Sequence, residues 1–183
     1  MLDFTMDIDA DGVAVITWDV KSRSMNVLTR EAYALLEGLI DDALADPTVK
    51  GLVLTSGKDS FAGGMDLTTL ASISAEAGDD PAQALFDFTM GGHRVLRKLE
   101  RAGMDPKTNK GGKPVAVAIT GTCAGIGTEL ALACHRRFMV DNPKARIGLP
   151  EILVGLFPGG GGTGLAGRQD AAPQSRQIGT AGR

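Results

Sequence analysis

Short apolar runs of strand length alternate along this chain with longer segments of helical periodicity. The runs lie at Val13–Trp18, Gly51–Ser56 and Val115–Ile119, and β-branched residues recur in them. Between the first two runs, Thr29 can cap a helix whose leucine, isoleucine and alanine residues repeat at spacings of three and four. Strands that alternate with helices in this way predict an α/β fold, because a helix between two strands packs its apolar face on their sheet.

The elements after the second strand are less regular. Residues 71–83 are small and acidic and predict a surface connection, and residues 84–101 follow with the periodicity of a helix. After the third strand, a turn of small residues should lead into a helix at Thr128–Cys134. A short strand is expected at residues 138–140 and an extended or looped segment at residues 147–157.

Composition and cysteine usage exclude several classes of protein. A length of 183 residues suits one domain, and a net charge of −3 lacks the basic excess that nucleic-acid binding requires. No apolar run reaches the roughly 18 residues of a membrane helix, and no signal peptide is visible. Cys123 and Cys134 form no zinc or disulfide motif, and His93 and His135 are isolated. We therefore expect a cytoplasmic protein without nucleic-acid, membrane or metal partners.

Three glycine-rich segments are candidates for ligand binding. Gly159–Gly164 has the spacing of a dinucleotide fingerprint, but it lacks the preceding strand and the acidic residue about 20 positions later that give this motif meaning. A nucleotide-binding oxidoreductase domain is therefore disfavoured. The other two, Ser60–Leu67 and Gly121–Leu130, follow predicted strands, where small residues let the backbone approach a ligand and free amides can bind an oxyanion. An ordinary strand-to-helix turn is the alternative for Ser60–Leu67.

Two carboxylates accompany these turns. Glu129 lies at the beginning of a predicted helix, where a solvent-facing acid that stabilises the helix dipole is the alternative. Glu151 lies in the apolar stretch Ile147–Glu151, where an unpaired carboxylate costs free energy. Two carboxylates in apolar settings near unpaired amides are the groups that acid–base chemistry beside a carbonyl requires.

Three motifs, taken in order, resemble the crotonase (enoyl-CoA hydratase/isomerase) family. Lys113–Glu129 and Ile147–Thr163 are similar to its two central motifs, and Phe61–Asp66 is similar to its first oxyanion loop. The interval from Glu129 to Glu151 and the long polar segment before Lys113 most resemble the N-terminal hydratase domain of fatty acid oxidation complex alpha subunits.

The resemblance implies an α/β fold built as a spiral of ββα units, with a homo-oligomer or a fatty acid oxidation complex as the assembly of an intact chain. Residues 1–163 should form an incomplete crotonase-like domain that lacks the C-terminal helices of the family. Residues 164–183 resemble no part of the family and show no apolar periodicity, so we expect this tail to be disordered.

The family motif, carried over to this sequence, assigns two oxyanion amides to Met65 and Ile126. Ile126 stands where the family usually has a glycine, so its branched side chain would narrow the approach to the thioester. Glu129 would take a proton from the water that adds to C3, and Glu151 would supply the proton at C2. Ser22–Asn26 would lie near the CoA nucleotide. The other residues implied to bind substrate are Ala62, Gly63, Gly64, Asp66, Gly125 and Pro150.

The function implied by the resemblance is that of an enoyl-CoA hydratase, a lyase that adds water syn to trans-2-enoyl-CoA in fatty acid β-oxidation. The partner would be an acyl-CoA thioester, and no cofactor would be needed, since coenzyme A is part of the substrate. Two alternatives stay open: an enoyl-CoA isomerase, and an inactive, truncated remnant of such a domain.

Overall fold

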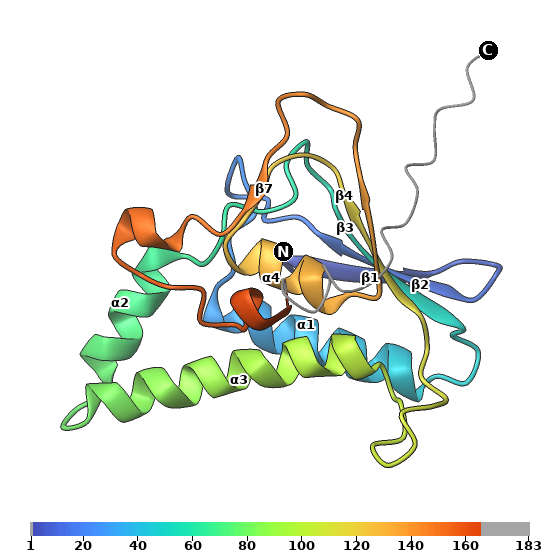
Figure 1. The fold of residues 1–183 in the computed structure, drawn as a ribbon, viewed down its shortest axis with the longest axis horizontal. Coiled ribbons are helices and arrows are strands. Elements are labelled where there is room, and N and C mark those ends of the chain that lie inside the picture. Colours follow the sequence, from blue (N-terminus) through green and yellow to red (C-terminus); the bar gives the residue numbers. More distant parts are fainter. Residues whose placement is uncertain (1, 166–183) are drawn as a thin grey trace.

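The main sheet follows the order of the chain. The computed structural model describes residues 2–165, and within them the sheet has five strands (Figure 1). The first pair is antiparallel and the others are parallel. In spatial order the strands are β1 (Phe4–Ile8), β2 (Val13–Trp18), β3 (Gly51–Ser56), β4 (Val115–Ile119) and β6 (Arg136–Met139). The three strands predicted from apolar runs are confirmed to the residue, whereas β1 lacks an apolar run and was not predicted.

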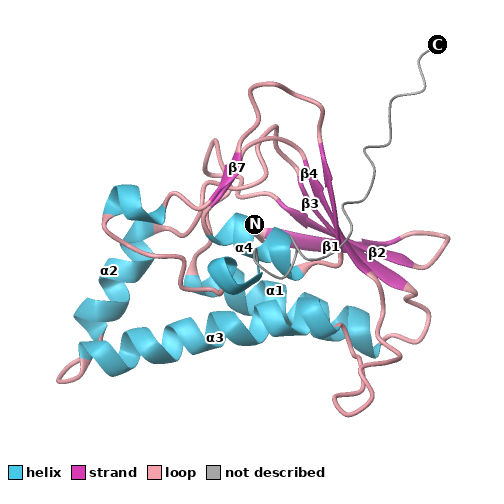
Figure 2. Ribbon diagram, viewed as in Figure 1, coloured by secondary structure: helices cyan, strands magenta, loops and turns pink. Residues whose placement is uncertain are grey.

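Helices pack on the sheet and on one another (Figure 2). The long helix α3 contacts the three other α-helices of the described residues. Thr29 caps α1 as predicted, with its Oγ1 accepting a hydrogen bond from the Ala32 amide at 3.1 Å. The helix ends before Pro47, because proline disfavours helical backbone in the residue that precedes it. The helices are α1 (Arg30–Ala45), α2 (Leu67–Glu76), α3 (Pro81–Arg101) and α4 (Ile126–Ala133).

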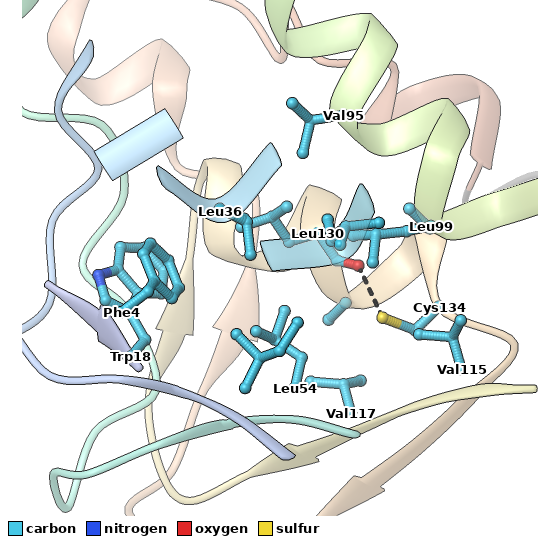
Figure 3. Packing of buried hydrophobic residues seen from close by; sticks show 14 of the residues in the cluster. Phe4, Trp18, Leu36, Leu54, Val95, Leu99, Val115, Val117, Leu130 and Cys134 are labelled. Carbon is cyan, nitrogen blue, oxygen red and sulfur yellow. Dashed lines mark hydrogen bonds between the residues drawn. The ribbon is translucent and has the colours of Figure 1, made fainter. Parts of the chain in front are cut away.

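The core lies between the sheet and the helices (Figure 3). Alternate residues of β4 are buried, beginning with Val115, as the twofold period of a strand requires. Leu36 from α1, Leu99 from α3 and Leu130 from α4 are also buried and face the strand residues. At the β1 end of the sheet, the rings of Phe4 and Trp18 stack with centroids 5.1 Å apart. This core fixes the ends of β3 and β4. The two loops that contribute to the site, at residues 61–66 and 121–127, follow these strand ends.

The predicted surface connection at residues 71–83 is wrong. Most of it belongs to α2, which ends at Glu76, and to the first turn of α3. The Asp66 and Asp80 side chains cap these two helices, and Pro81 occupies the first turn of α3, where its missing N–H costs nothing. Small residues such as alanine favour a helix once caps are present, so small size alone was a poor guide to a loop.

Several further boundaries differ from the prediction. The short strand expected at residues 138–140 is β6, at Arg136–Met139, and the helix expected at residues 84–101 begins at Pro81. The helix expected at Thr128–Cys134 begins two residues earlier, at Ile126, which places the Ile126 amide in its first turn. The looped segment at 147–157 contains the short strand β7 (Ile147–Gly148) and the 3-10 turn η1 (Glu151–Val154). The predicted domain boundary at residue 163 falls within a helical turn at residues 162–165, and the remainder of the predicted tail, 166–183, lies outside the described residues.

A second, small pairing joins the three motif segments. The strand β5 (Cys123–Ala124) pairs with β7, and an isolated bridge joins Cys123 to Ala62. Another bridge joins Met65 to Leu28. Backbone hydrogen bonds therefore hold the 61–66 loop, the 121–127 turn and the 147–151 segment against one another.

Asn26 is a buried hydrogen-bond centre. Its Nδ2 lies 2.9 Å from the Trp18 carbonyl oxygen, 2.9 Å from Ser56 Oγ and 3.0 Å from the Phe61 carbonyl oxygen, and its Oδ1 accepts from the Val20 amide at 2.9 Å. One side chain thus links the ends of β2 and β3 to the 61–66 loop. This end of the Ser22–Asn26 segment is part of the interior, and its predicted place near the CoA nucleotide stays a prediction.

Replacing Asn26 with alanine should lower the free energy of unfolding by about 3 kcal/mol or more, because several buried polar groups lose their partner at once. Urea unfolding followed by circular dichroism measures the change. Asn142→Ala is the matched control, since among the described residues this exposed side chain accepts only a local loop hydrogen bond, from the Lys144 amide. Equal losses of unfolding free energy in the two variants would show that the Asn26 hydrogen bonds stabilise the fold no more than a local loop hydrogen bond does.

Candidate active site

The three motif segments meet at a cleft of about 680 Å³. Its walls include Met65 from the 61–66 loop, Ile126 and Glu129 from α4, and Glu151 from η1. Residues of α2 and α3, among them Leu70 and Phe88, add an apolar side to the cleft. The structure therefore brings both predicted carboxylates and both predicted amide positions to one place.

Glu129 is a buried acid in the first turn of α4. Only 2% of the residue is exposed, and its Oε1 accepts a hydrogen bond from the Gly162 amide at 2.8 Å. Burial raises the pKa of Glu129 above its ordinary value, and the nearby charge of Glu151 raises it further, while the Gly162 N–H lowers it. The solvent-facing alternative for this acid is therefore wrong.

Glu151 begins the η1 turn and reaches back over the 121–127 turn. Its Oε1 lies 3.5 Å from the position that a Cβ would occupy on Gly125. Its Oε2 is buried and has no hydrogen-bond partner within residues 2–165. A buried carboxyl oxygen without a protein partner costs free energy unless a water, a proton or a ligand satisfies it.

Met65 and Ile126 each offer a backbone amide at the cleft. Within the described part of the chain, neither amide donates a hydrogen bond to another protein group. Ile126 is the first residue of α4, where helix geometry leaves the N–H without an internal acceptor. The residues before them, Gly64 and Gly125, have φ values of 112° and 57°, and a Cβ on Gly125 would lie 3.3 Å from the Gly64 Cα, so both positions favour glycine.

The glycine run Gly159–Gly162 closes around Glu129. A Cβ on Gly160 would lie 2.6 Å from Glu129 Oε2, and one on Gly162 would lie 3.0 Å from Glu129 Oε1. At Gly160 and Gly162 the carboxylate occupies the space that a side chain would need, whereas Gly161 favours glycine through its φ of 100°. The glycines that imitate a dinucleotide fingerprint, Gly159, Gly161 and Gly164, are not the ones that Glu129 crowds, so this spacing carries no ligand-binding meaning here.

The predicted substrate-binding residues divide into two groups. Gly63, Gly64, Gly125 and Pro150 line the cleft. Asp66 does not: its Oδ1 accepts from the Thr68 amide at 2.8 Å, which caps α2, and its Oδ2 forms an ion pair with Arg23 at 2.6 Å.

Ala62 also lies outside the cleft lining. It packs behind the cleft against α4, where a Cβ on Gly127 would come within 2.4 Å of the Ala62 Cβ. Its carbonyl oxygen accepts a hydrogen bond from the Ala124 amide at 2.9 Å. The structure thus gives Ala62 and Asp66 supporting places beside the site.

Two residues near the cleft were not predicted. Tyr33 of α1 lines it, and its hydroxyl oxygen would lie 2.8 Å from a Cβ on Gly92, so glycine is needed there. Burial raises the pKa of Tyr33 well above its ordinary value, so its hydroxyl stays protonated. His93, the next residue of α3, contacts the glycine run instead of the cleft. The pair Gly91–Gly92 inside a helical pattern was the available signal, since glycine is unfavourable there without a packing reason.

The raised pKa of Glu129 gives a test of its burial by protein stability. A buried carboxyl group with a raised pKa destabilises the folded state when it is ionised, that is, at a pH above this pKa. Glutamine carries no charge at any pH, so Glu129→Gln should melt at a higher temperature than the parent chain at pH 8. Toward pH 4 the difference should disappear, and each kcal/mol corresponds to about 2–4 °C. Glu31→Gln, an exposed first-turn acid of α1, is the control. A pH-independent loss of stability in Glu129→Gln would contradict this account.

Comparison with known proteins identifies the family of this chain. The family model of enoyl-CoA hydratase/isomerase matches residues 9–179, so the chain belongs to this family, the crotonases. The matched range continues past residue 163. The fold is likewise similar to that of a crystallised enoyl-CoA hydratase from Geobacillus kaustophilus, with a TM-score of 0.76 and 29% identity over 92% of this chain and 56% of that one. An enoyl-CoA hydratase from Bacillus anthracis gives a TM-score of 0.74 at 24% identity.

Among curated proteins, the chain is similar to the alpha subunit of fatty acid oxidation complexes. The subunit of Shewanella halifaxensis is 42% identical over 154 residues, which is 84% of this chain and 20% of that protein. The subunit of Shewanella oneidensis is 40% identical over 161 residues. The chain spans about a fifth of the length of these relatives.

Proposed function

We propose that this chain adds water to trans-2-enoyl-CoA thioesters. The observation that carries the proposal is the meeting of Glu129 and Glu151 in one cleft with two backbone amides, those of Met65 and Ile126, that have no partner among the described residues. Acid–base groups and oxyanion donors together are what hydration beside a thioester carbonyl requires.

The amides would bind the thioester oxygen, which gains negative charge as the transition state becomes enolate-like. Glu129, held by the Gly162 amide, would accept a proton from water as the water oxygen bonds to C3. Glu151 would deliver a proton to C2, so that H and OH add to the same face. The two carboxyl groups then exchange their protons with solvent, which restores the starting state.

The apolar side of the cleft supports an acyl thioester as the substrate. Leu67, Leu70, Phe88 and Leu153 line it, and such a surface binds a hydrocarbon chain by removing it from water. The relatives are named as subunits of fatty acid oxidation complexes, which supports a role in fatty acid β-oxidation. Assembly of a longer form of the chain as a homo-oligomer or within such a complex is part of the same proposal.

We also place the chain in the cytoplasm. Cys123 and Cys134 are both buried, free thiols, which suits a reducing compartment. None of the helices within residues 2–165 is both long and apolar enough to span a bilayer.

The proposed reaction needs no cofactor, because the thioester, one water and two carboxyl groups complete it. Dialysis against a chelator should therefore leave the hydration rate within twofold of the untreated rate. Within the described residues, no group of three or more histidine, cysteine, aspartate or glutamate side chains is placed to hold a metal. A large loss of rate that added Mg²⁺ or Zn²⁺ restores would contradict the cofactor-free reaction.

Mass spectrometry of the product separates the proposed hydratase from the alternatives. Hydration of trans-2-enoyl-CoA in H₂¹⁸O should give a 3-hydroxyacyl-CoA that carries one ¹⁸O atom. An isomerase would move the double bond of a 3-enoyl-CoA without a change in mass. A folded chain that gives neither product would favour the remnant.

A further inference from the structure

The glycine run Gly159–Gly162 separates the cleft from a second cavity. This cavity, of about 810 Å³, lies between α3 and residues 160–165. Gly160 lines both spaces, whereas Glu129 lines only the cleft and His93 lines only the second cavity. A thin, side-chain-free wall thus stands between an imidazole and the buried carboxyl group.

His93 is bonded to that wall. Its Nε2 lies 2.6 Å from the Gly159 carbonyl oxygen, and since a carbonyl only accepts, the ring nitrogen is the donor. Three residues further on, the Gly162 amide donates to Glu129 Oε1 at 2.8 Å. Between the two bonds, Gly160 approaches Glu129 Oε2 too closely for any side chain. The hydrogen bond from α3 therefore acts on the same short segment that fixes the carboxyl group.

We propose that His93 is a positioning residue for Glu129, which it holds in place through the glycine run. It is not a catalytic residue, because it lies behind the wall and does not line the cleft. Without its N–H, the run of glycines has wide backbone freedom and no side chains to restrain it. The Gly162 amide would then leave the carboxyl group for part of the time, and Glu129 would be less often aligned with the water. This inference rests on the proposed role of Glu129 as the base.

The electrostatic setting of Glu129 gives a readout apart from catalysis. The groups that face it are Glu151 from η1, His93 from α3 and Tyr33 from α1. Burial and Glu151 raise the pKa of Glu129, whereas the Gly162 N–H and His93 lower it. Loss of the His93 contact should therefore move the titration of Glu129 to higher pH.

The test compares two substitutions of similar size. His93→Gln keeps an N–H donor for the Gly159 carbonyl, and His93→Met fills the space without one. We expect His93→Met to lower kcat about 10- to 100-fold relative to His93→Gln, with KM changed less than threefold, because misplacement of a catalytic group costs rate more than binding. Arg94→Ala, the exposed neighbour on α3, is the control and should keep the parental kcat.

Carbon-13 NMR titration of the Glu129 carboxyl group supplies the second measurement. Its midpoint should rise in both variants, because both lose the His93 charge, and it should rise further in His93→Met, which also loses the donor that holds the glycine run and its Gly162 N–H against the carboxyl group. Equal kcat values for the two variants, or equal titration midpoints, would overturn the proposal. If the parent chain hydrates no enoyl-CoA but the midpoint still rises further in His93→Met, the positioning role stands and the proposed hydratase function fails.

Discussion

Glu151→Gln is expected to lower kcat for enoyl-CoA hydration by about 100- to 10,000-fold, the usual contribution of a positioned acid or base. Glutamine keeps the shape of the side chain but cannot give a proton to C2. Glu129→Gln should cost a similar factor, because an amide cannot accept the proton of the attacking water. Steady-state kinetics, followed by loss of the absorbance of the conjugated thioester, measure both changes.

The matched control for these variants is Glu31→Gln. Glu31 lies in the first turn of α1, as Glu129 does in α4, but its side chain is exposed. The hydration rate of Glu31→Gln should equal that of the parent chain. Equal rates in all four proteins would mean that Glu129 and Glu151 are structural acids.

Ile126→Pro is expected to lower kcat by about 100- to 1,000-fold, the typical cost of losing one oxyanion donor. The substitution removes the backbone N–H that we assign to the thioester oxygen, and it also replaces the buried isoleucine side chain with the smaller proline ring. Ile126 is the first residue of α4, where proline is well tolerated, and Gly125 before it has a ψ of −131°, outside the helical region that a following proline disfavours. The helix should therefore form as before.

Ile126→Val is the control, since it keeps the amide and most of the side chain. Its kcat should remain within about threefold of the parental value, because no hydrogen-bond donor is lost. Circular dichroism should show the same helix content in both variants. If Ile126→Pro is folded and as active as Ile126→Val, the Ile126 amide is no part of an oxyanion site.

Much of this fold follows from local sequence patterns. The strands Val13–Trp18, Gly51–Ser56 and Val115–Ile119 are short apolar runs in a parallel or central position, where both faces are covered and the signal is strong. The helix after Thr29 combines a cap, an amphipathic period and a following Pro47. The strand β1 has one buried residue, Phe4, and one half-buried residue, Met6, and its other three residues are exposed, so its apolar signal is weak.

The missed features of the site depend on contacts between distant segments. The carboxylates Glu129 and Glu151 stand out because they lie in apolar surroundings along the chain itself. Tyr33 and His93 belong to helices whose sequence patterns indicate only an apolar face. Tyr33 packs against Gly92, 59 residues later in the chain, and His93 bonds to Gly159, 66 residues later. Asp66 could be read as a ligand or as a helix cap, and only the presence of α2 decides between these readings.

The most direct test of the central claim compares the parent chain with the double variant Glu129→Gln/Glu151→Gln on trans-2-enoyl-CoA. Both proteins should first be shown to be folded by thermal melting. The account predicts steady loss of the conjugated thioester absorbance with the parent chain, and a rate at least about 100-fold lower with the double variant. A folded parent chain whose turnover does not exceed that of the double variant would contradict it.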